Sequence, residues 1–214
     1  MTITVVTSAL ELGFIYSLVA LALFLSFRIL NIADMTTDGS FTLGCAVSAT
    51  VAVAGHPWLA LPAAMLAGAA AVVIVLFLNT RLGLSIRATG DNPDMVRASS
   101  INTGFTITVG LCISNALTAL SGAVLAQYQK TADINLGTGM VIIGLASLII
   151  GETIFRSRSL WLKALGALVG CIVYRFIIAI ALRLDIPSEC LKLVSAVIVA
   201  LAIALPNIKK KGAR

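Results

Sequence analysis

Three ionisable side chains stand inside long apolar runs, where a charge has the greatest chemical consequence. They are Glu11, Glu152 in "GMVIIGLASLIIGE" and Arg175 in "VYRFI". A charge at membrane depth costs several kcal/mol unless it is paired or faces a water-filled path. A buried pair of Arg175 with Glu11 or Glu152 that fixes helix register is the favoured interpretation. Direct solute contact and snorkelling of Arg175 are the alternatives.

Patterns that mark catalytic or metal sites are missing from the sequence. It contains no H-E-x-x-H, no G-x-S-x-G, no G-x-x-x-x-G-K-[ST] phosphate loop and no paired intramembrane aspartates. The four cysteines are scattered and His56 is the only histidine, which leaves no metal-ligand spacing. We therefore expect no enzyme activity, no metal and no cofactor in this chain.

The composition is that of an integral membrane protein. Of the 214 residues, 59% are apolar and 11% charged, with a mean hydropathy of +1.06, whereas soluble domains carry about 25% charged residues. A spanning helix needs about 20 mostly apolar residues. We predict an all-α polytopic membrane helix bundle, a single transmembrane domain over 1–214, with about seven spans: 5–27, 41–54, 59–78, 103–126, 138–155, 160–182 and 190–206.

Two of these spans, 41–54 and 138–155, are short and contain glycine. Such segments are typical of helices that are broken or that line a cavity, because unsatisfied backbone is tolerated only there. We therefore expect broken helices among the full spans.

Basic residues are distributed unequally between the two sides that alternating spans define. The loops 28–40, 79–102, 156–163 and 207–214 carry 11 basic residues, against three on the other side. By the positive-inside rule the first set is cytoplasmic. The carboxyl terminus would then be cytoplasmic and the amino terminus outside.

The longest polar stretch, "RLGLSIRATGDNPDMVRASSINTG", lies on the side assigned to the cytoplasm. Within it Asp91 or Asn92 can cap a helix, and Pro93 suits the first helical position. Asp94 interacts favourably with the positive end of the helix dipole. These residues predict a short helix from Pro93 to Ser100.

This short helix would expose two neighbouring apolar side chains, Met95 and Val96. A solvated linker needs neither good caps nor exposed apolar residues. Docking to a partner is therefore the favoured interpretation of the polar stretch.

The stretch resembles the cytoplasmic coupling segment, here 81–103, of ABC importer permeases of the branched-chain amino acid and ribose type. "GFIYSLVALALFLSFRILNIADMTTDGSFTLG" (13–44), "ALTALSGAVLAQYQ" (116–129) and "GMVIIGLASLIIGE" (139–152) resemble further signatures of that superfamily in the same order. The pattern is most similar to the subgroup associated with tryptophan or tyrosine. The resemblance covers nearly the whole chain.

The resemblance implies a coupling helix seated in a groove of a cytoplasmic ATPase, which would hydrolyse ATP-Mg. It also implies a second permease copy, an extracytoplasmic substrate-binding protein and a bacterial plasma (inner) membrane location. Met95, Val96 and Ile101 would make the apolar contacts with the ATPase, and Arg87 and Arg97 would meet its polar rim. The implied ATPase-coupling residues are Arg87, Asp91, Pro93, Asp94, Met95, Val96, Arg97 and Ile101.

The segment "NIADMTTDGSFTLG" (31–44) has two interpretations. It can be a re-entrant segment in which Asp38 begins a short helix and Ser40 and Thr42 line the translocation path. It can also be an ordinary loop in which Asp38 or Ser40 caps the next helix. The resemblance favours a role for Asp38, Ser40 and Thr42 beside the path.

The chain departs from the subgroup in its middle, where "AAVVIVLFLNTRLGL" directly joins two segments that a further stretch of roughly two spans usually separates. Removing an even number of spans leaves the topology unchanged. The function predicted is that of a permease subunit of an ATP-driven importer for a small solute, with an aromatic amino acid favoured. The alternative is a stand-alone secondary transporter or small channel, which would leave the capped cytoplasmic helix without a role.

Overall fold

The computed structural model describes residues 3–53, 76–155, 159–183 and 197, and every regular element in these ranges is helical. Four helical segments there are long and apolar enough to cross a membrane: Val5–Ile29, Thr103–Gln129, Ile134–Ile154 and Leu160–Leu182. The expected all-α membrane bundle is confirmed. All of the expected span 190–206 except residue 197, and most of 59–78, lie outside the described residues.

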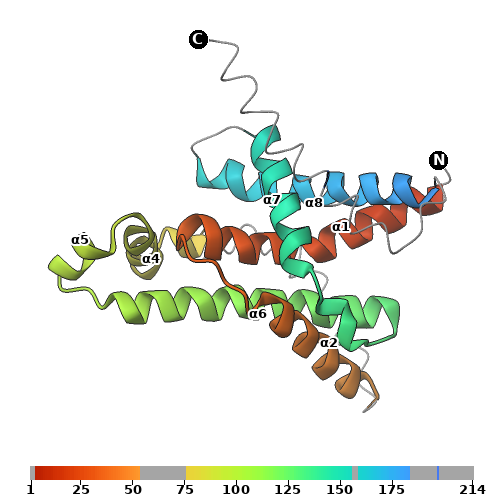
Figure 1. Cartoon of the computed structure of the whole chain (residues 1–214), viewed down its shortest axis with the longest axis horizontal. Coiled ribbons are helices and arrows are strands. Elements are labelled where there is room, and N and C mark those ends of the chain that lie inside the picture. The colour runs from red at the N-terminus through yellow and green to blue at the C-terminus, as the bar shows by residue number, and fades with distance from the viewer. Residues whose placement is uncertain (1–2, 54–75, 156–158, 184–196, 198–214) are drawn as a thin grey trace, which may run out of the picture.

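Helix α1 (Ile3–Leu23) is the centre of the bundle and continues into a π-helical turn, η1 (Phe24–Ile29). It packs against α6 (Thr103–Gln129), α7 (Met140–Ile154) and α8 (Leu160–Arg183). Figure 1 shows α6 and α8 running along α1 while α7 crosses it. Residues 15–26 of α1 and η1 are all buried, and all of them except Ser17 and Ser26 are apolar, as expected of a helix stretch that is surrounded by neighbours.

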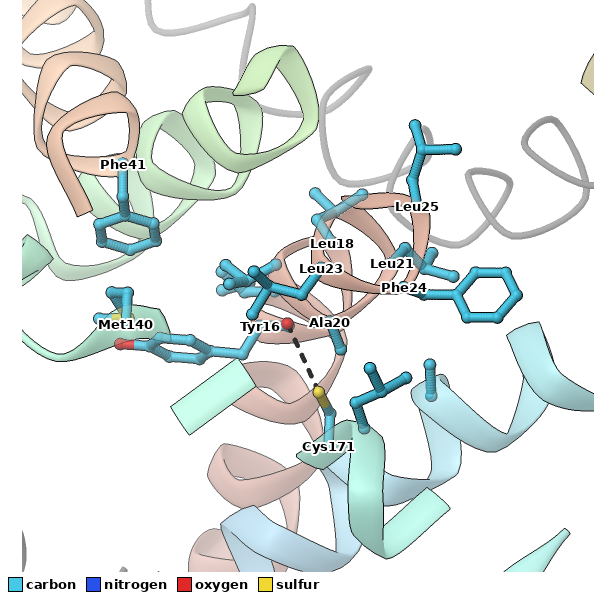
Figure 2. Packing of buried hydrophobic residues seen from close by; sticks show 14 of the residues in the cluster. Tyr16, Leu18, Ala20, Leu21, Leu23, Phe24, Leu25, Phe41, Met140 and Cys171 are labelled. Atoms are coloured by element: carbon cyan, nitrogen blue, oxygen red, sulfur yellow. Dashed lines mark hydrogen bonds between the residues drawn. The ribbon is translucent and has the colours of Figure 1, made fainter. Parts of the chain in front are cut away.

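The core of the bundle is the middle of α1. Leu18, Leu21 and Phe24 are fully buried, and Phe41 from α2 (Thr37–Val53) and Cys171 from α8 reach the same cluster. Figure 2 shows these side chains around α1, with the Cys171 thiol donating to the Tyr16 carbonyl oxygen at 3.4 Å.

Helix α6 turns its small and hydroxyl-bearing side chains inward. Within the bilayer, packing and interhelical hydrogen bonds rather than hydrophobic exclusion hold helices together, so small residues gather at contacts. The hydroxyl of Ser114 donates to the Ala22 carbonyl at 2.8 Å, and that of Ser121 donates to the Ile15 carbonyl at 2.7 Å. This buried face extends along α6 from its first residue: Thr103, Thr106, Gly110, Ser114, Thr118, Ser121 and Gly122.

Helix α2 begins beside the middle of α6 and covers only one half of it. Ser40 touches Asn115, which is twelve residues into α6 and so about 18 Å from its start. Further along, Cys45 and Ser48 hydrogen-bond to the carbonyls of Gly122 and Ala123. The short helices expected near 41–54 and 138–155 are present as α2 and α7.

Close packing of α7 on α8 depends on glycines. A Cβ atom on Gly170 would meet the Ser147 carbonyl, and one on Gly151 would meet the backbone of Gly166. The connection from α6 to α7 contains a single 3-10 turn, η3 (Ile134–Gly137), which packs against α2. Helices α4 (Arg81–Asp91) and α5 (Pro93–Ala98) precede α6 and lie at the end of the bundle where α1 finishes (Figure 1).

Candidate functional site

The segment before α6 contains two helices, α4 and α5, and these two and α6 all begin with a capping residue. Each of α4, α5 and α6 begins after a residue whose side-chain oxygen accepts hydrogen bonds from backbone amides: Thr80, Asn92 and Asn102. Asn92 Oδ1 accepts from the amides of Asp94 and Met95, both at 3.1 Å. Such caps satisfy the amides that a helix start leaves unpaired. Asn92 is therefore the cap of α5, and Asp91 is the last residue of α4.

Helix α5 also ends in a defined motif. Ser100 adopts a left-handed conformation (φ 60°), and its amide donates to the Arg97 carbonyl while the Ile101 amide donates to the Val96 carbonyl. This pairing is the Schellman motif. With Pro93 at its first position and both ends closed, a helix of only six residues has a fixed shape.

Helix α4 attaches this segment to the bundle. Its buried face consists of Gly83, Ile86 and Thr89. The hydroxyls of Thr89 and Thr106 of α6 share a buried hydrogen bond at 2.9 Å. A Cβ atom on Gly90 would collide with the carbonyl of Ile29, so α4 lies directly against the end of η1. Movement of α4 and α5 would therefore reach both α1 and α6.

The apolar pair on α5 is divided between inside and outside. Met95 is 69% exposed, whereas Val96 is 4% exposed and packs within the chain. The expectation that both face a partner is therefore corrected for Val96. Two neighbours on a helix point about 100° apart, so one faces inward when α5 rests on the bundle.

Two of the remaining predicted coupling residues, Asp94 and Arg97, lie on α5 itself. Arg97 donates from Nε to Thr103 Oγ1 at 3.2 Å and lies 3.5 Å from the carboxylate of Asp94. Both charged side chains are mostly exposed. Arg87 on α4 and Ile101 after α5 are half-buried.

A cluster of polar side chains lies where α2 begins beside α6, and we call it the α2–α6 polar cluster: Asp34, Thr36, Ser40 and Asn115. Asp34 is 6% exposed. Its Oδ1 accepts from the Thr36 amide (2.8 Å) and hydroxyl (2.6 Å), and its Oδ2 accepts from Asn115 Nδ2 (3.0 Å). Ser40 donates to Asn115 Oδ1 at 2.5 Å. The cluster thus joins the loop before α2 to the middle of a spanning helix.

The three residues expected beside a path have separate roles in the structure. Ser40 belongs to the polar cluster. The carboxylate of Asp38 accepts from the amides of Gly139 and Val141, both at 3.0 Å, and so caps the start of α7. The Thr42 hydroxyl donates to the Asp38 carbonyl at 2.9 Å. Asp38 therefore connects the starts of the two short helices.

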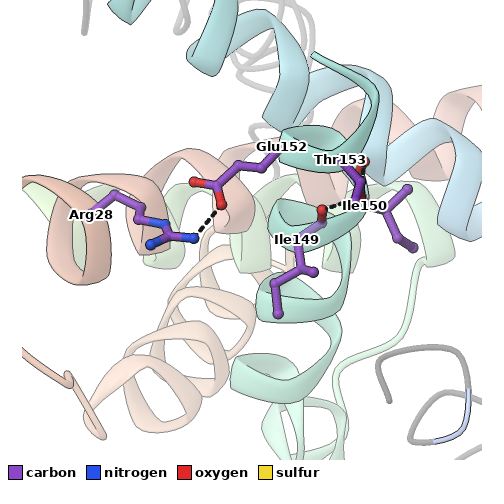
Figure 3. Close-up of polar contacts among 5 residues, drawn as sticks. All are labelled: Arg28, Ile149, Ile150, Glu152 and Thr153. Carbon is purple, nitrogen blue, oxygen red and sulfur yellow. Dashed lines mark hydrogen bonds and ion pairs between the residues drawn. The ribbon is translucent and has the colours of Figure 1, made fainter. Parts of the chain in front are cut away.

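The three intramembrane charges are not brought together as expected. Glu152 forms an ion pair with Arg28 of η1 (Figure 3). Glu11 accepts a hydrogen bond from the Tyr128 hydroxyl at 2.8 Å. The Arg175 guanidinium lies over the Tyr16 ring, 3.5 Å from its centroid. The partner of Arg175 is therefore the aromatic face of Tyr16 and not a carboxylate as predicted. A ring can replace a carboxylate in this role because its quadrupole also attracts a cation.

Sequence reasoning missed Asn115 and Arg28. An asparagine in the middle of a 27-residue apolar helix is itself a signal, because a polar group at membrane depth needs partners. Arg28 was interpreted only as a loop charge that sets topology. Its partner follows 124 residues later, and no spacing in the sequence indicates that contact.

The helical bundle agrees with comparisons to known families. A family model described as "Branched-chain amino acid transport system / permease component" matches residues 69–205. The chain belongs to this family, the permease components of ABC-type transport systems. Its homologues are permease subunits rather than enzymes, and the family in general implies partner ATPases and substrate-binding proteins.

Individual relatives extend this result. The tyrosine transport system permease protein of Clostridioides difficile is 28% identical, covering 95% of this chain and 92% of that protein. An uncharacterised protein of Rickettsia prowazekii is 26% identical over 97% of this chain and 99% of its own length. The ribose import permease protein of Escherichia coli is 26% identical over 62% of this chain and 40% of that protein. No solved structure matches the chain significantly.

The alignment with the Clostridioides difficile protein also shows that the relative has residues that this chain lacks. It extends over 270 positions, so at least 56 of them have no residue among the 214 of this chain. The relative therefore has residues with no counterpart here. Their number is enough for about two membrane spans.

Proposed function

We propose that this chain forms the translocation path of an ATP-driven importer for a small solute, an amino acid and most favourably an aromatic one. It works with a second permease copy, two ATPase subunits that bind ATP-Mg, and an extracytoplasmic substrate-binding protein. The amino acid rests on family membership and on the name of the tyrosine permease relative.

The observation that carries the proposal is the contrast between the two faces of the 81–103 segment. One face is fixed to α6 and η1 through Thr89, Thr106 and Gly90. The other presents Met95 on a short helix with both ends closed. A rigid exposed helix that is attached to two bundle helices can transmit movement of an ATPase to the path.

The path is proposed to follow the side of α2 and α6 that carries the polar cluster. Leu43 and Val47 of α2 are exposed, and a Cβ atom on Gly39 would meet nothing within 4 Å. A second copy would cover this face and enclose the cluster. Asp38, Ser40 and Thr42 would stand beside the path, with Ser40 nearest the solute. The distribution of basic residues supports a cytoplasmic location for α4 and α5, and the carboxyl terminus is proposed to lie on the same side.

The test is co-purification of the candidate ATPase with the permease in nanodiscs. Met95→Asp places a charge on the proposed docking face, and Ile134→Asp places the same charge on an exposed residue of η3, beyond the other end of α6. We expect wild type and Ile134→Asp to retain the ATPase and Met95→Asp to lose it. Failure of the wild-type chain to retain any ATPase overturns the proposal and favours a stand-alone transporter or channel.

A further inference from the structure

The α2–α6 polar cluster contains more hydrogen-bond acceptors than donors. The Thr36 hydroxyl lies 2.6 Å from Asp34 Oδ1 and 3.0 Å from Asn115 Oδ1. A hydroxyl has one proton, and a carboxylate is the stronger acceptor at the shorter distance. The contact between Thr36 Oγ1 and Asn115 Oδ1 is then a contact between two oxygens with no hydrogen between them.

The other protons of the cluster are also in use. Asn115 Nδ2 donates to Asp34 Oδ2 and to the Leu111 carbonyl, and Ser40 donates to Asn115 Oδ1. The opposite orientation of the Asn115 amide would set its oxygen against the Asp34 carboxylate, so the observed orientation is the favourable one. Lone pairs on Thr36, Ser40 and Asn115 remain available, and no donor does.

The cluster also holds a negative charge without a cationic partner among the described residues. Among the described residues, the ion pairs join Arg28 to Glu152 and Arg97 to Asp94, and neither involves Asp34. The second nearby carboxylate, Asp38, is directed to the amides that begin α7. A buried charge is costly unless an opposite charge or enough donors compensate it.

One side of the cluster is open. Thr36 is exposed, Ser40 and Asn115 are half-buried, and the space beside Gly39 is empty. A ligand can therefore reach the oxygens of Thr36, Ser40 and Asn115. Asp34 lies behind them and accepts hydrogen bonds from Thr36 and Asn115. The cluster also lies about midway along α6, at the depth where a solute has left both aqueous phases.

We infer that the α2–α6 polar cluster binds the ammonium group of a transported amine. An ammonium group has a positive charge and three N–H donors, which match the buried carboxylate and the three reachable oxygens. The inference rests on the proposed function and deepens it, because it makes a primary amine the class of solute and assigns its contacts to Thr36, Ser40 and Asn115.

The first test measures thermal unfolding of the purified permease–ATPase complex in nanodiscs. The probes are tyramine, which has an ammonium group and no carboxylate, 3-(4-hydroxyphenyl)propionate, which has the reverse, and KCl. We expect a concentration-dependent rise in Tm with tyramine alone. An equal rise with KCl would identify an alkali-cation site, and an equal rise with the propionate would show binding through the ring. Either result overturns the inference.

Variants locate the effect. Asp34→Asn keeps the shape of the side chain and removes its charge, while Asp133→Asn removes an exposed carboxylate before η3 as the matched control. We expect the tyramine shift to vanish in the first and to persist in the second. Ser40→Ala removes one reachable acceptor and leaves Asp34 intact, so it keeps the test decisive if Asp34→Asn folds poorly. A full shift in folded Asp34→Asn or Ser40→Ala contradicts the inference.

Tyrosine uptake by cells that express the complete importer separates this inference from the proposed function. Loss of a charge-assisted hydrogen bond predicts uptake lower by about tenfold or more in Asp34→Asn, with ATPase co-purification unchanged. Equal uptake by wild type and Asp34→Asn would contradict the proposed ammonium site without contradicting the proposed importer function. Failure of the wild-type chain to bind the ATPase would instead contradict the proposed importer function.

Discussion

Arg28 and Glu152 form an ion pair between the π-helical turn that ends α1 and the last turn of α7. The pair joins a full span to a short helix at the end of the bundle that bears α4 and α5. Figure 3 shows the two side chains reaching toward each other from their separate helices. Arg28 is next to Ile29, whose carbonyl oxygen lies against Gly90 of α4, so the ion pair lies close to the segment 81–103.

This pair predicts a measurable coupling between the two positions. The Arg28 side chain is about half exposed, so solvent screening keeps the contribution small, about 0.5–1 kcal/mol. Arg28→Gln and Glu152→Gln should each lower the free energy of unfolding in bicelles, and the double variant should lose less than the sum. Strict additivity in this double-mutant cycle would show that the pair contributes nothing.

Burial on α5 predicts opposite behaviour for two neighbouring residues. Val96→Asp places a carboxylate at a position that is 4% exposed, which should cost several kcal/mol and sharply reduce the yield of folded protein. Met95→Asp should change the stability by less than about 0.5 kcal/mol. The yield of monodisperse protein in size-exclusion chromatography measures both. Comparable yields for the two variants would mean that Val96 does not face the bundle.

Glycines at the contact of α2 with α6 predict a second contrast. A Cβ atom on Gly122 would meet the Phe41 carbonyl, whereas one on Gly39 has open space. Gly122→Ala should separate the helices and lower the free energy of unfolding by about 1–3 kcal/mol. Gly39→Ala should leave it unchanged or raise it, because alanine is the better helix former. Thermal unfolding tests this, and a stable Gly122→Ala protein would contradict the packing.

Stacking of Arg175 on Tyr16 predicts that the ring, and not the hydroxyl, supports the charge. Tyr16→Phe keeps the aromatic face and should preserve the Tm within a few degrees. Tyr16→Leu removes it, and loss of a cation–π contact away from water should lower the free energy of unfolding by about 2 kcal/mol. If Arg175→Gln restores much of the stability of Tyr16→Leu, the uncompensated charge is the cause. Equal stability of Tyr16→Phe and Tyr16→Leu would show that the stack is incidental.

Local chemistry made part of the site predictable. The sequence "NPD" contains a cap, a proline suited to the first turn and an acidic residue, and these indicated the start of α5 without tertiary information. Its neighbour α4 was not predicted as a helix, because two glycines, Gly83 and Gly90, lie within it. Glycine is a poor helix former and often marks a turn.

Contacts between distant residues could not be predicted in this way. Asp34 and Asn115 are 81 residues apart, and their pairing depends on α2 starting beside the middle of α6. Similarly, no pattern distinguishes Met95 from Val96 on a helix of six residues, because two turns are needed before a face repeats. The partners of Arg175 and Glu152 were wrongly matched because opposite charge alone does not fix which helices are neighbours.

The inward hydroxyls of α6 have a consequence for how the chain is made. Before it packs against α1, a newly inserted α6 can satisfy these groups within itself, as Thr106 and Thr118 still do by donating to carbonyls of the preceding turn. The segment Thr103–Gln129 is also long and apolar enough to span a membrane. Assembly then needs only an exchange of partners, in which Ser114 and Ser121 give up internal acceptors for carbonyls of α1. The helix is therefore expected to be stable as a single span in the bilayer before it packs against α1.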